Sequence, residues 1–408
     1  MTRPGLTVLV AARDEEDRIG ATVTALAAAF PDAEIVVADD GSRDRTRAVA
    51  SGAGARVVAL PRRGKGQALT VAERACREGP LLLCDADLTG DLRPLVDAGA
   101  DVAIARFARR AGGGLGLAKG VAGALIAFRG GRSVAEPLSG QRALSVRARA
   151  EVFPVAAGFG VETRMTIDAL RAGLDTREVE LDLAHRATGR DVDGFVHRGR
   201  QLRDLLLATL LPQATSHRGL RLPLVGSVVG LVVPSVAPVA AVGLADDLWS
   251  GPERGFRAHL RRGATTGSLK LVVIPLWALW RTRSVGSAVL VGLAANVVNQ
   301  LDTRPGRALK AFLVGSALLG GRPRKGLVLA VLLAPYDLRE MSMLGDAGSN
   351  AFGAMLGLES VRRLTGLRRA SAIGALAAVT LVGERRSLGS LIERTPVLRD
   401  LDSFGRHP

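Results

Sequence analysis

Two apolar runs that end in acids decide the fold of this chain: Ile35-Val36-Val37-Ala38-Asp39-Asp40-Gly41-Ser42 and Leu81-Leu82-Leu83-Cys84-Asp85-Ala86-Asp87. Short continuous apolar runs of this kind are typical of parallel strands, which are buried on both faces. Both runs place their acids at the carboxyl end of the strand, where open α/β sheets bind ligands. Hard cations such as Mg²⁺ take carboxylate oxygens together with substrate phosphate oxygens. The two runs therefore predict a site for a nucleotide and a divalent cation.

The sequence around these runs alternates between strand-like and helix-like segments. Further apolar runs and stretches of helical periodicity follow one another at 6–12, 17–30, 56–60, 68–77 and 102–105. This alternation predicts an α/β fold with a doubly wound, mostly parallel sheet. Gly64-Lys65-Gly66 opens one of the helices, where glycines let the backbone approach a phosphate and Lys65 can answer its charge. The alternative is a plain glycine turn with a solvated lysine.

The composition changes near residue 212. Before it, charged residues alternate with apolar strands and amphipathic helices; after it, apolar blocks are separated by short breaks rich in Arg, Gly and Pro. We therefore expect two domains, residues 1–212 and 213–408. The net charge of +16 would suit a protein that binds nucleic acid. With one tyrosine and three tryptophans, however, the chain has no stretch in which aromatic and basic residues alternate. We therefore expect no nucleic-acid partner. We expect the Arg-rich breaks to lie against an anionic membrane face.

Four motifs occur in order in the first domain: Val8-Leu9-Val10-Ala11-Ala12-Arg13-Asp14-Glu15-Glu16, Asp39-Asp40-Gly41-Ser42-Arg43-Asp44, Gly64-Lys65-Gly66 and Asp85-Ala86-Asp87. Together they resemble the signature of family-2 nucleotide-sugar glycosyltransferases. The resemblance implies the nucleotide-diphospho-sugar transferase type of α/β fold and metal-dependent transfer from a nucleoside-diphosphate sugar. It implies that Asp39 binds the base or ribose and that Asp85 and Asp87 hold Mg²⁺ or Mn²⁺ on the donor diphosphate. The alternative is that these acids are solvated turn residues.

The same resemblance extends the expected donor site to Asp14, Asp40 and Lys65. Glu162, at the start of a predicted helix at 163–172, falls where many relatives carry an acid at the reaction centre. A carboxylate there can take the acceptor proton or stabilise developing positive charge. Glu162 and Asp87 are therefore the expected catalytic residues. Alternatively, Glu162 is only a helix N-terminal acid.

A strand predicted at 179–183 leads into Ala184-His185-Arg186-Ala187-Thr188-Gly189-Arg190. In some metal-dependent members of the resembled family, a histidine in this position joins the Asp-x-Asp as a metal ligand. The resemblance thus implies His185 as a third ligand, and imidazole with carboxylates suits Mn²⁺ somewhat better than Mg²⁺. Arg186 and Arg190 could hold the donor phosphates. The alternative for His185 is a capping or core histidine.

A second set of motifs follows in the second domain: Gly243-Leu244-Ala245-Asp246-Asp247, Thr266-Gly267-Ser268-Leu269-Lys270, Asn296-Val297-Val298-Asn299-Gln300-Leu301-Asp302 and Leu344-Gly345-Asp346-Ala347-Gly348-Ser349-Asn350. Their order resembles the polyprenyl-phosphate sugar-1-phosphate transferases, which are integral membrane enzymes. The resemblance implies that acids here bind Mg²⁺ and a donor diphosphate. The matching residues are Asp247, Lys270, Asn299, Asp302 and Asp346.

Apolar blocks separate these motifs and predict an all-α, multi-pass membrane domain. Two blocks lie between Asp247 and Asp302, and two between Asp302 and Asp346, so paired crossings would bring all three acids to one face. The domain departs from the resembled family, because several blocks are shorter than the ~20 residues that span a bilayer. Thr303 also follows Asp302, where the family has glycine. Pro234 and Pro238 predict a break in the first block.

We therefore expect a membrane-associated glycosyltransferase of the bacterial cytoplasmic membrane, multi-pass, with its first domain in the cytosol. The expected acceptor is a polyprenyl phosphate or a cell-envelope glycan precursor. Two alternatives remain: sugar-1-phosphate transfer to polyprenyl phosphate by the second domain, and a non-catalytic membrane scaffold. The intact Asp39, Asp85 and Asp87 argue against the scaffold, and the altered step after Asp302 argues against the phosphotransferase.

Overall fold

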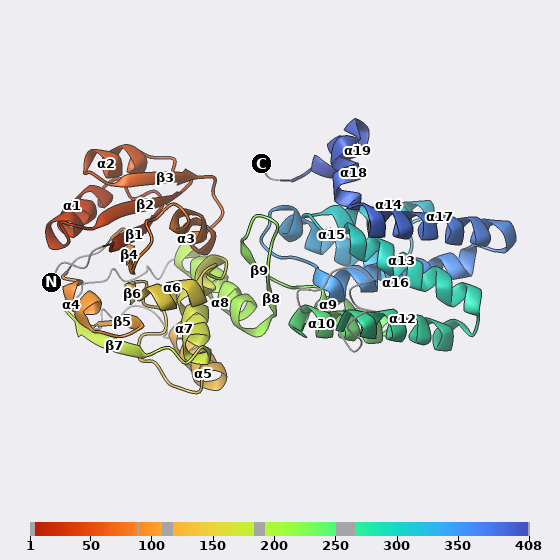
Figure 1. The fold of residues 1–408 in the computed structure, drawn as a ribbon, viewed down its shortest axis with the longest axis horizontal. Helices are drawn as coiled ribbons and strands as arrows, with labels where there is room; N and C mark the ends of the chain where they lie inside the picture. Colours follow the sequence, from red (N-terminus) through yellow and green to blue (C-terminus); the bar gives the residue numbers. More distant parts are fainter. Residues whose placement is uncertain (1–4, 88–89, 108–116, 183–191, 250–265, 407–408) are drawn as a thin grey trace. The chain divides into compact units, whose positions relative to one another are not determined.

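The computed structural model describes residues 5–87, 90–107, 117–182, 192–249 and 266–406 (Figure 1). The chain divides into two compact units, Met1–Arg221 and Leu222–Pro408. The division follows residue 221 rather than 212, because the segment after Pro212 is held to the first unit. Arg74 donates hydrogen bonds to the carbonyls of Arg218 and Gly219, at 2.9 and 2.5 Å. Arg221 forms a salt bridge of 2.6 Å with Asp168.

The first unit is built on one seven-stranded sheet with the strand order β3-β2-β1-β4-β6-β5-β7. Its strands are β1 Thr7–Ala12, β2 Glu34–Asp40, β3 Arg56–Leu60, β4 Leu81–Asp85, β5 Val102–Phe107, β6 Arg142–Leu144 and β7 Thr176–Leu181. All the pairings are parallel except those of β6, which runs antiparallel to β4 and β5. The prediction of a mostly parallel sheet is confirmed. β6 was missed because three residues, one of them an arginine, carry no apolar pattern.

Helices cover both faces of this sheet. They are α1 Ile19–Ala29, α2 Thr46–Gly52, α3 Lys65–Glu73, α4 Arg93–Asp97, α5 Leu117–Gly130, α6 Val146–Val152, α7 Val161–Arg171 and α8 Val192–Leu210. Alternate residues of β1 enter different cores, because successive strand side chains point to opposite faces. Val8 and Val10 pack in a core with residues of α1 and α4, whereas Leu9 packs in one with residues of α3 and α7.

The second unit is a helical bundle in its described part. Its helices are α9 Ser227–Val232, α10 Ala237–Trp249, α12 Thr266–Thr282, α13 Val285–Leu301, α14 Arg307–Leu318, α15 Arg324–Leu338, α16 Gly345–Arg363, α17 Gly366–Arg385, α18 Leu388–Arg394 and α19 Pro396–Ser403. Helix α16 is buried along most of its length. Gly353 lets it approach α13, since a Cβ there would lie 2.5 Å from the Ala294 carbonyl oxygen. The predicted break near Pro234 is confirmed by the short 3₁₀ turn between α9 and α10.

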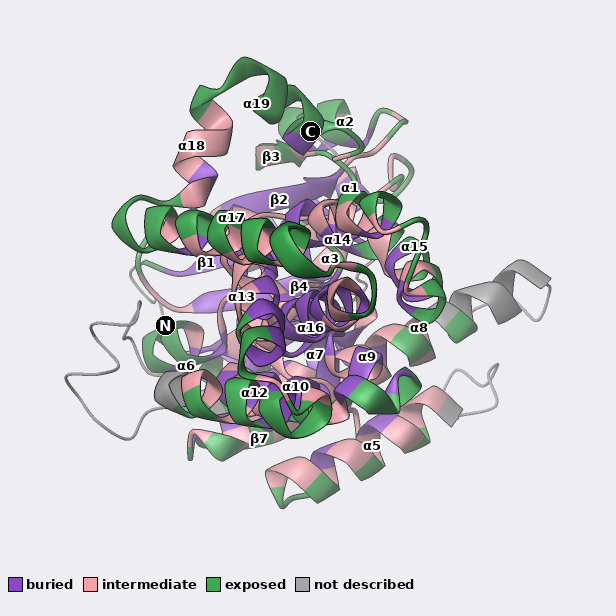
Figure 2. Ribbon diagram, turned by 90° about the vertical axis from the view of Figure 1, so that its right-hand side faces the viewer, coloured by how far each residue is buried: buried purple, intermediate pink, exposed green. Residues whose placement is uncertain are grey.

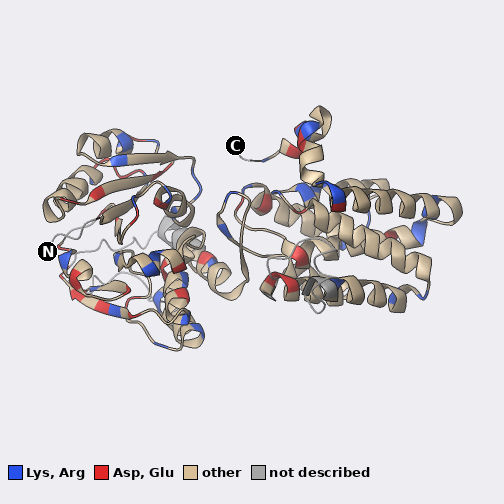
Figure 3. Cartoon of the chain, in the orientation of Figure 1, with Lys and Arg blue, Asp and Glu red and all other residues tan. Residues whose placement is uncertain are grey.

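The two units differ in what they expose. Among the described residues, the exposed large apolar side chains of the first unit are Phe128, Leu138, Val146 and Leu210, and all the others belong to the second unit. Exposed residues run along the outer faces of α12 and α17 (Figure 2), while the lengths of the bundle helices carry few charges (Figure 3). One helix of the described chain, Gly366–Arg385, is long and apolar enough to cross a bilayer. The expected multi-pass domain is therefore not confirmed.

Candidate functional site

The carboxyl ends of β2 and β4 flank the end of β1. In the sheet register, Ala12 of β1 lies opposite Asp39, and Ala11 lies opposite Asp85. Two acids that are far apart in the sequence therefore face each other across one central strand. This is the edge at which open α/β sheets bind ligands.

A lysine joins two carboxylates at this edge. The Lys65 ammonium lies 2.6 Å from Asp85 Oδ1 and 2.7 Å from Glu162 Oε1. Lys65 is the first residue of α3, and Glu162 stands in the first turn of α7, so two helix N-termini point at the group. Burial alone would lower the pKa of Lys65, but the charges of Asp85 and Glu162 raise it above its ordinary value. The lysine is therefore charged throughout the physiological pH range.

The three other acids of the predicted donor site serve different purposes. Asp39 is fully buried and forms a 2.6 Å ion pair with the half-exposed Arg47. Asp40 accepts hydrogen bonds from the amides of Arg63 and Gly64, at 2.6 and 2.9 Å. Asp14 accepts one from the Arg43 amide at 2.8 Å. Asp40 and Asp14 thus shape the loops that surround the site, and Arg47 is a residue of this region that the sequence argument missed.

Asp87 lies two residues beyond Asp85, past the end of β4, and is partly exposed. Burial raises the pKa of Glu15, and the charge of Asp87 adds to that rise, which places the two carboxylates near each other. Asp87 thus lies within electrostatic reach of the segment after β1. His185, Arg186 and Arg190 lie outside the described residues.

The segment before β6 closes one side of the site. Gln141 donates a 3.4 Å hydrogen bond to Asp85 Oδ2, and its own Oε1 is buried without a partner among the described residues. Gly140 passes so close that a Cβ there would lie 2.2 Å from the same Asp85 oxygen. Neither residue was predicted as a site residue. Their contact with Asp85 depends on the β4–β6 pairing, which the sequence did not reveal.

A fully buried arginine fixes this segment to α7. Arg142 donates to the Ser139 carbonyl at 2.8 Å and to Thr166 Oγ1 at 2.7 Å. Burial lowers the pKa of Arg142 to about 10, and the nearby Glu162 charge opposes that fall. Buried charges need such partners, because an unpaired one is costly. Arg142 therefore sets the position of the helix that carries Glu162.

The chemistry of the donor set fits a divalent cation. Asp85 already holds one cation, the Lys65 ammonium, and its side chain remains 32% exposed. Asp87 supplies a second, partly exposed carboxylate near the same strand end. Oxygen pairs of this kind hold Mg²⁺ or Mn²⁺ when substrate phosphates complete the coordination. The described residues contain no group of three His, Cys, Asp or Glu side chains poised for a metal, so Asp85 and Asp87 would need further ligands.

The second unit contains its own polar cluster, which gathers residues from four helices. Lys270 of α12 pairs with Asp346 and with Asp246, the latter at 2.5 Å. Asn299 of α13 donates to Asp346 at 2.7 Å. The structure thus brings together three of the five residues predicted in this half, Lys270, Asn299 and Asp346.

The other two predicted residues join the same cluster. Asp247 accepts hydrogen bonds from the amides of Asp346 and Ala347, at 2.8 and 3.0 Å, and so caps the N-terminus of α16. Asp302 follows the end of α13. Burial raises its pKa, and the charges of Asp337, Asp346 and Asp247 raise it further, so Asp302 lies within their reach.

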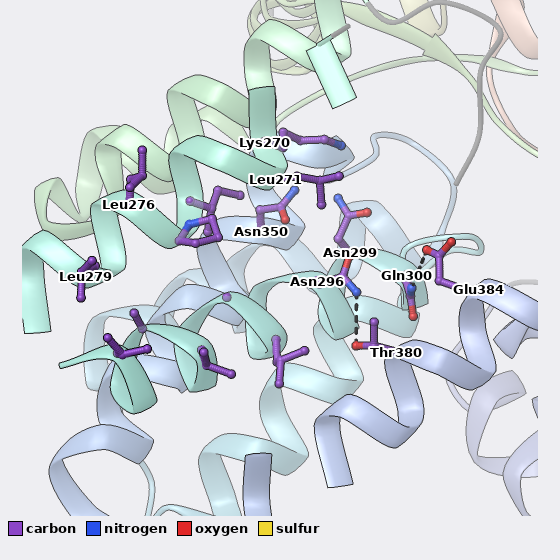
Figure 4. Close-up of a pocket in the computed structure, with 17 residues that line it drawn as sticks. Lys270, Leu271, Leu276, Leu279, Asn296, Asn299, Gln300, Asn350, Thr380 and Glu384 are labelled. Atoms are coloured by element: carbon purple, nitrogen blue, oxygen red, sulfur yellow. Dashed lines mark hydrogen bonds between the residues drawn. The ribbon is translucent and has the colours of Figure 1, made fainter. Parts of the chain in front are cut away.

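A cavity of about 600 Å³ opens beside this cluster, between α12, α13, α16 and α17. Its walls are mainly apolar and include Ile274, Leu276, Leu279 and Val289. Figure 4 shows Leu276 and Leu279 at one side and Lys270, Asn299 and Asn350 at the other. The arrangement fits a ligand with an apolar body and a polar head.

Comparison with known proteins finds relatives of the first unit. The profile of the family described as "Glycosyl transferase family 2" matches residues 7–110. The chain is 32% identical over 245 residues to the glucosyl-3-phosphoglycerate synthase of Mycolicibacterium paratuberculosis, a match that covers 50% of this chain and 71% of the relative. It is 32% identical over 173 residues to the glycosyltransferase AglJ of Haloferax volcanii, covering 40% of this chain and 57% of that relative.

Solved structures include the glucosyl-3-phosphoglycerate synthase of Mycobacterium tuberculosis in complex with Mn²⁺, uridine diphosphate and phosphoglyceric acid. It shares 28% identity with this chain, with a TM-score of 0.44, and the match covers 51% of this chain and 78% of that one. Another structure of that enzyme holds Mg²⁺ and uridine diphosphate, with 25% identity and a TM-score of 0.42, covering 52% and 82% of the two chains.

Proposed function

The chain belongs to glycosyl transferase family 2, and from this premise we propose that its first unit is a metal-dependent glycosyltransferase. Its donor would be a nucleoside-diphosphate sugar, with uridine diphosphate as the first nucleotide to test, because a relative binds it. The observation that carries the proposal is the group of Asp85, Lys65 and Glu162 at the carboxyl end of the sheet. Transfer from a nucleoside-diphosphate sugar requires a cation, a lysine that binds phosphate and a buried acid. This group supplies the lysine, the acid and one carboxylate for the cation.

Each residue of the group has a proposed task. Asp85 and Asp87 would hold Mg²⁺ or Mn²⁺, which neutralises charge on the leaving diphosphate. Lys65 is long enough to exchange a carboxylate for a diphosphate oxygen, and the N-terminus of α3 favours the same negative charge. Movement of that ammonium to the diphosphate would leave the Glu162 carboxylate without its cationic partner. Glu162 could then accept the proton of an acceptor hydroxyl or stabilise positive charge at the sugar.

The second unit supports a lipid acceptor. Its apolar exterior and its α17 helix favour membrane association. The cavity beside Lys270 would accept the apolar chain and phosphate of a polyprenyl phosphate. The M. tuberculosis relative was solved with phosphoglyceric acid, a soluble compound, so that compound is the competing acceptor. An acceptor held in the same membrane as the enzyme would meet the first unit at a raised effective concentration.

The direct test incubates membranes that contain the full chain with a panel of labelled nucleotide sugars and a divalent cation. We expect label in the lipid extract, with a nucleoside diphosphate released. Chelation of the cation should abolish the transfer. Label found only in added phosphoglyceric acid would reject the lipid acceptor while keeping the transferase. No transfer to either acceptor from any donor in the panel would reject the proposed function.

A second candidate function is sugar-1-phosphate transfer by the second unit. The convergence of Asp247, Asp302 and Asp346 beside the cavity favours it, because several buried acids with a lysine could hold a cation and a diphosphate.

The released nucleotide separates the two candidates. Sugar-1-phosphate transfer releases a nucleoside monophosphate, and Asp346→Asn would abolish it. We expect instead that Asp346→Asn leaves diphosphate release within about threefold of the unmutated rate, since the proposed catalytic residues all belong to the first unit. A lipid label that depends on Asp346 and accompanies monophosphate release would reverse this ranking.

A further inference from the structure

The C-terminal helix α19 turns an apolar side outward. Val397, Leu401 and Phe404 are 69%, 62% and 79% exposed, although all three are large apolar side chains. Val397 and Leu401, four residues apart, share one side of α19, and Phe404 follows directly after the end of the helix. Arg399 and Ser403 are also exposed and fall on a different side, and the exposed Asp400 lies at the border of the apolar side. The segment therefore has an apolar face that no described residue covers.

Buried ion pairs keep that face outward. Asp402, which is 8% exposed, pairs with Arg307 of α14 at 2.7 Å and with Arg406 at 2.5 Å. Lys310, also of α14, donates to the Leu401 carbonyl at 3.2 Å. Rotating α19 to bury its apolar side would pull Asp402 from Arg307 and leave the buried Arg307 charge without this partner, which is strongly unfavourable. The exposure is therefore a fixed property of the fold.

The direction of α18 and α19 fits a surface. Figures 1 and 2 show both helices running across the direction of the bundle helices. They follow the C-terminal end of α17, the helix of the described chain that is long enough to cross a bilayer. With α17 across the membrane, α19 would lie parallel to the membrane plane at one surface. Amphipathic helices that bind membranes adopt this orientation.

The charges near α19 select the kind of surface. Arg385, Arg386 and Arg394 are exposed and flank the segment along the chain. Arg399 is offset by its own ion pair with Asp400, at 3.4 Å. The acid of α18, Glu393, pairs with Arg304 at 3.0 Å. The remaining positive charge complements anionic lipid headgroups, which attract basic residues near the membrane surface.

We propose that α19 is an interfacial helix, with Val397, Leu401 and Phe404 inserted at the headgroup boundary of an anionic bilayer. The proposal rests on the membrane association proposed above and adds the residues that set the depth of the bundle. It commits to a lipid surface, because the exposed face combines apolar side chains with flanking arginines and lies across the helix that would span the bilayer.

The test places a tryptophan on each side of α19 in the full chain. Phe404→Trp reports on the apolar side, and Ser403→Trp, at an exposed polar position, is the matched control. Both proteins are placed in nanodiscs of phosphatidylcholine with phosphatidylglycerol, and their emission is compared with that of the unmutated chain, which has three tryptophans. We expect a blue shift for Trp at 404 and quenching by lipids brominated high on the acyl chain. Iodide should quench it about threefold less than Trp at 403, because an inserted ring is shielded from water.

Three outcomes would contradict the proposal, and they are separable. Equal iodide quenching at positions 403 and 404, in chains that do enter nanodiscs, overturns the interfacial helix alone. A chain that does not enter nanodiscs at all overturns the proposed membrane association with it. An identical shift in phosphatidylcholine alone overturns the selection of anionic lipid. Adding Asp402→Asn to Phe404→Trp should restore iodide access, since the ion pairs that orient α19 are then lost.

Discussion

At the scale of single residues, Asp85 and Asp87 have different surroundings although one residue separates them. Asp85 is held by Lys65 and Gln141, so replacing it would leave the Lys65 ammonium with Glu162 alone. Asp87 is partly exposed and stands beyond the end of β4. Removing the Asp87 carboxylate opens no cavity in the core. Asp87 is therefore the better residue for separating a metal-binding role from a structural one.

We predict that Asp87→Ala loses sugar transfer and keeps the fold. Loss of a metal ligand should remove several kcal/mol of transition-state stabilisation, a decrease in turnover of roughly a hundredfold or more. Transfer of labelled sugar and thermal unfolding of the same preparation measure the two effects. Asp91→Ala is the matched control, because Asp91 is exposed and pairs with the nearby Arg93. Turnover close to normal in Asp87→Ala would remove Asp87 from the site.

At the scale of elements, the start of α3 shows how packing positions Lys65. Gly64 has a φ of +99°, a conformation that favours glycine. Gly66 touches the segment before α7, since a Cβ there would lie 1.9 Å from the Ala156 carbonyl oxygen. The two glycines thus serve a turn and a close approach within the protein. From the sequence, these glycines were expected to let a phosphate approach the backbone. The structure shows that they also allow close packing within the protein.

We predict that Gly66→Ala destabilises the first unit by about 1–3 kcal/mol, the usual cost of forcing extra volume into a packed site. Urea unfolding followed by circular dichroism measures the change. Gly52→Ala, in α2, is the control: a Cβ there meets nothing within 4 Å, and alanine favours the helix. Because α3 would shift with Lys65 on it, Gly66→Ala should also weaken donor binding. Equal stability of the two variants would show that the Gly66 contact is readily relieved.

At the scale of the whole molecule, one chain joins two units with different exteriors. The first has four exposed large apolar side chains among its described residues, Phe128, Leu138, Val146 and Leu210. The second exposes many along its helices, and its charged residues lie mostly near the ends of those helices (Figure 3). A surface of the first kind suits water, and one of the second kind suits a membrane or a large partner. The two units should therefore separate cleanly when the chain is divided.

We predict that a fragment ending at Arg221 is soluble without detergent and binds a nucleotide sugar with a divalent cation, yet transfers poorly to a lipid acceptor. A fragment ending at Pro212 should unfold at a lower temperature, because it loses the Arg221–Asp168 salt bridge and the carbonyls that accept from Arg74. The fragment from Leu222 onward should partition into membranes. Sedimentation, isothermal titration calorimetry and thermal unfolding test these points. A soluble, monomeric second fragment would contradict the membrane association.

The sequence alone determined the strands other than β6, the acids at the carboxyl ends of β2 and β4 and the helical nature of the second half, because apolar runs and helical periodicity are local properties. It also supplied Asp247, Asp302 and Asp346, which the bundle gathers at one end. Only the tertiary structure decided that Lys65 bridges Asp85 and Glu162, the second of which lies 97 residues further along the chain than Lys65. It likewise decided that Arg142 is buried and that Gln141 touches Asp85. The contacts of Arg142 and Gln141 follow from the insertion of β6 between β4 and β5, and a strand's neighbours depend on the packing of the whole sheet.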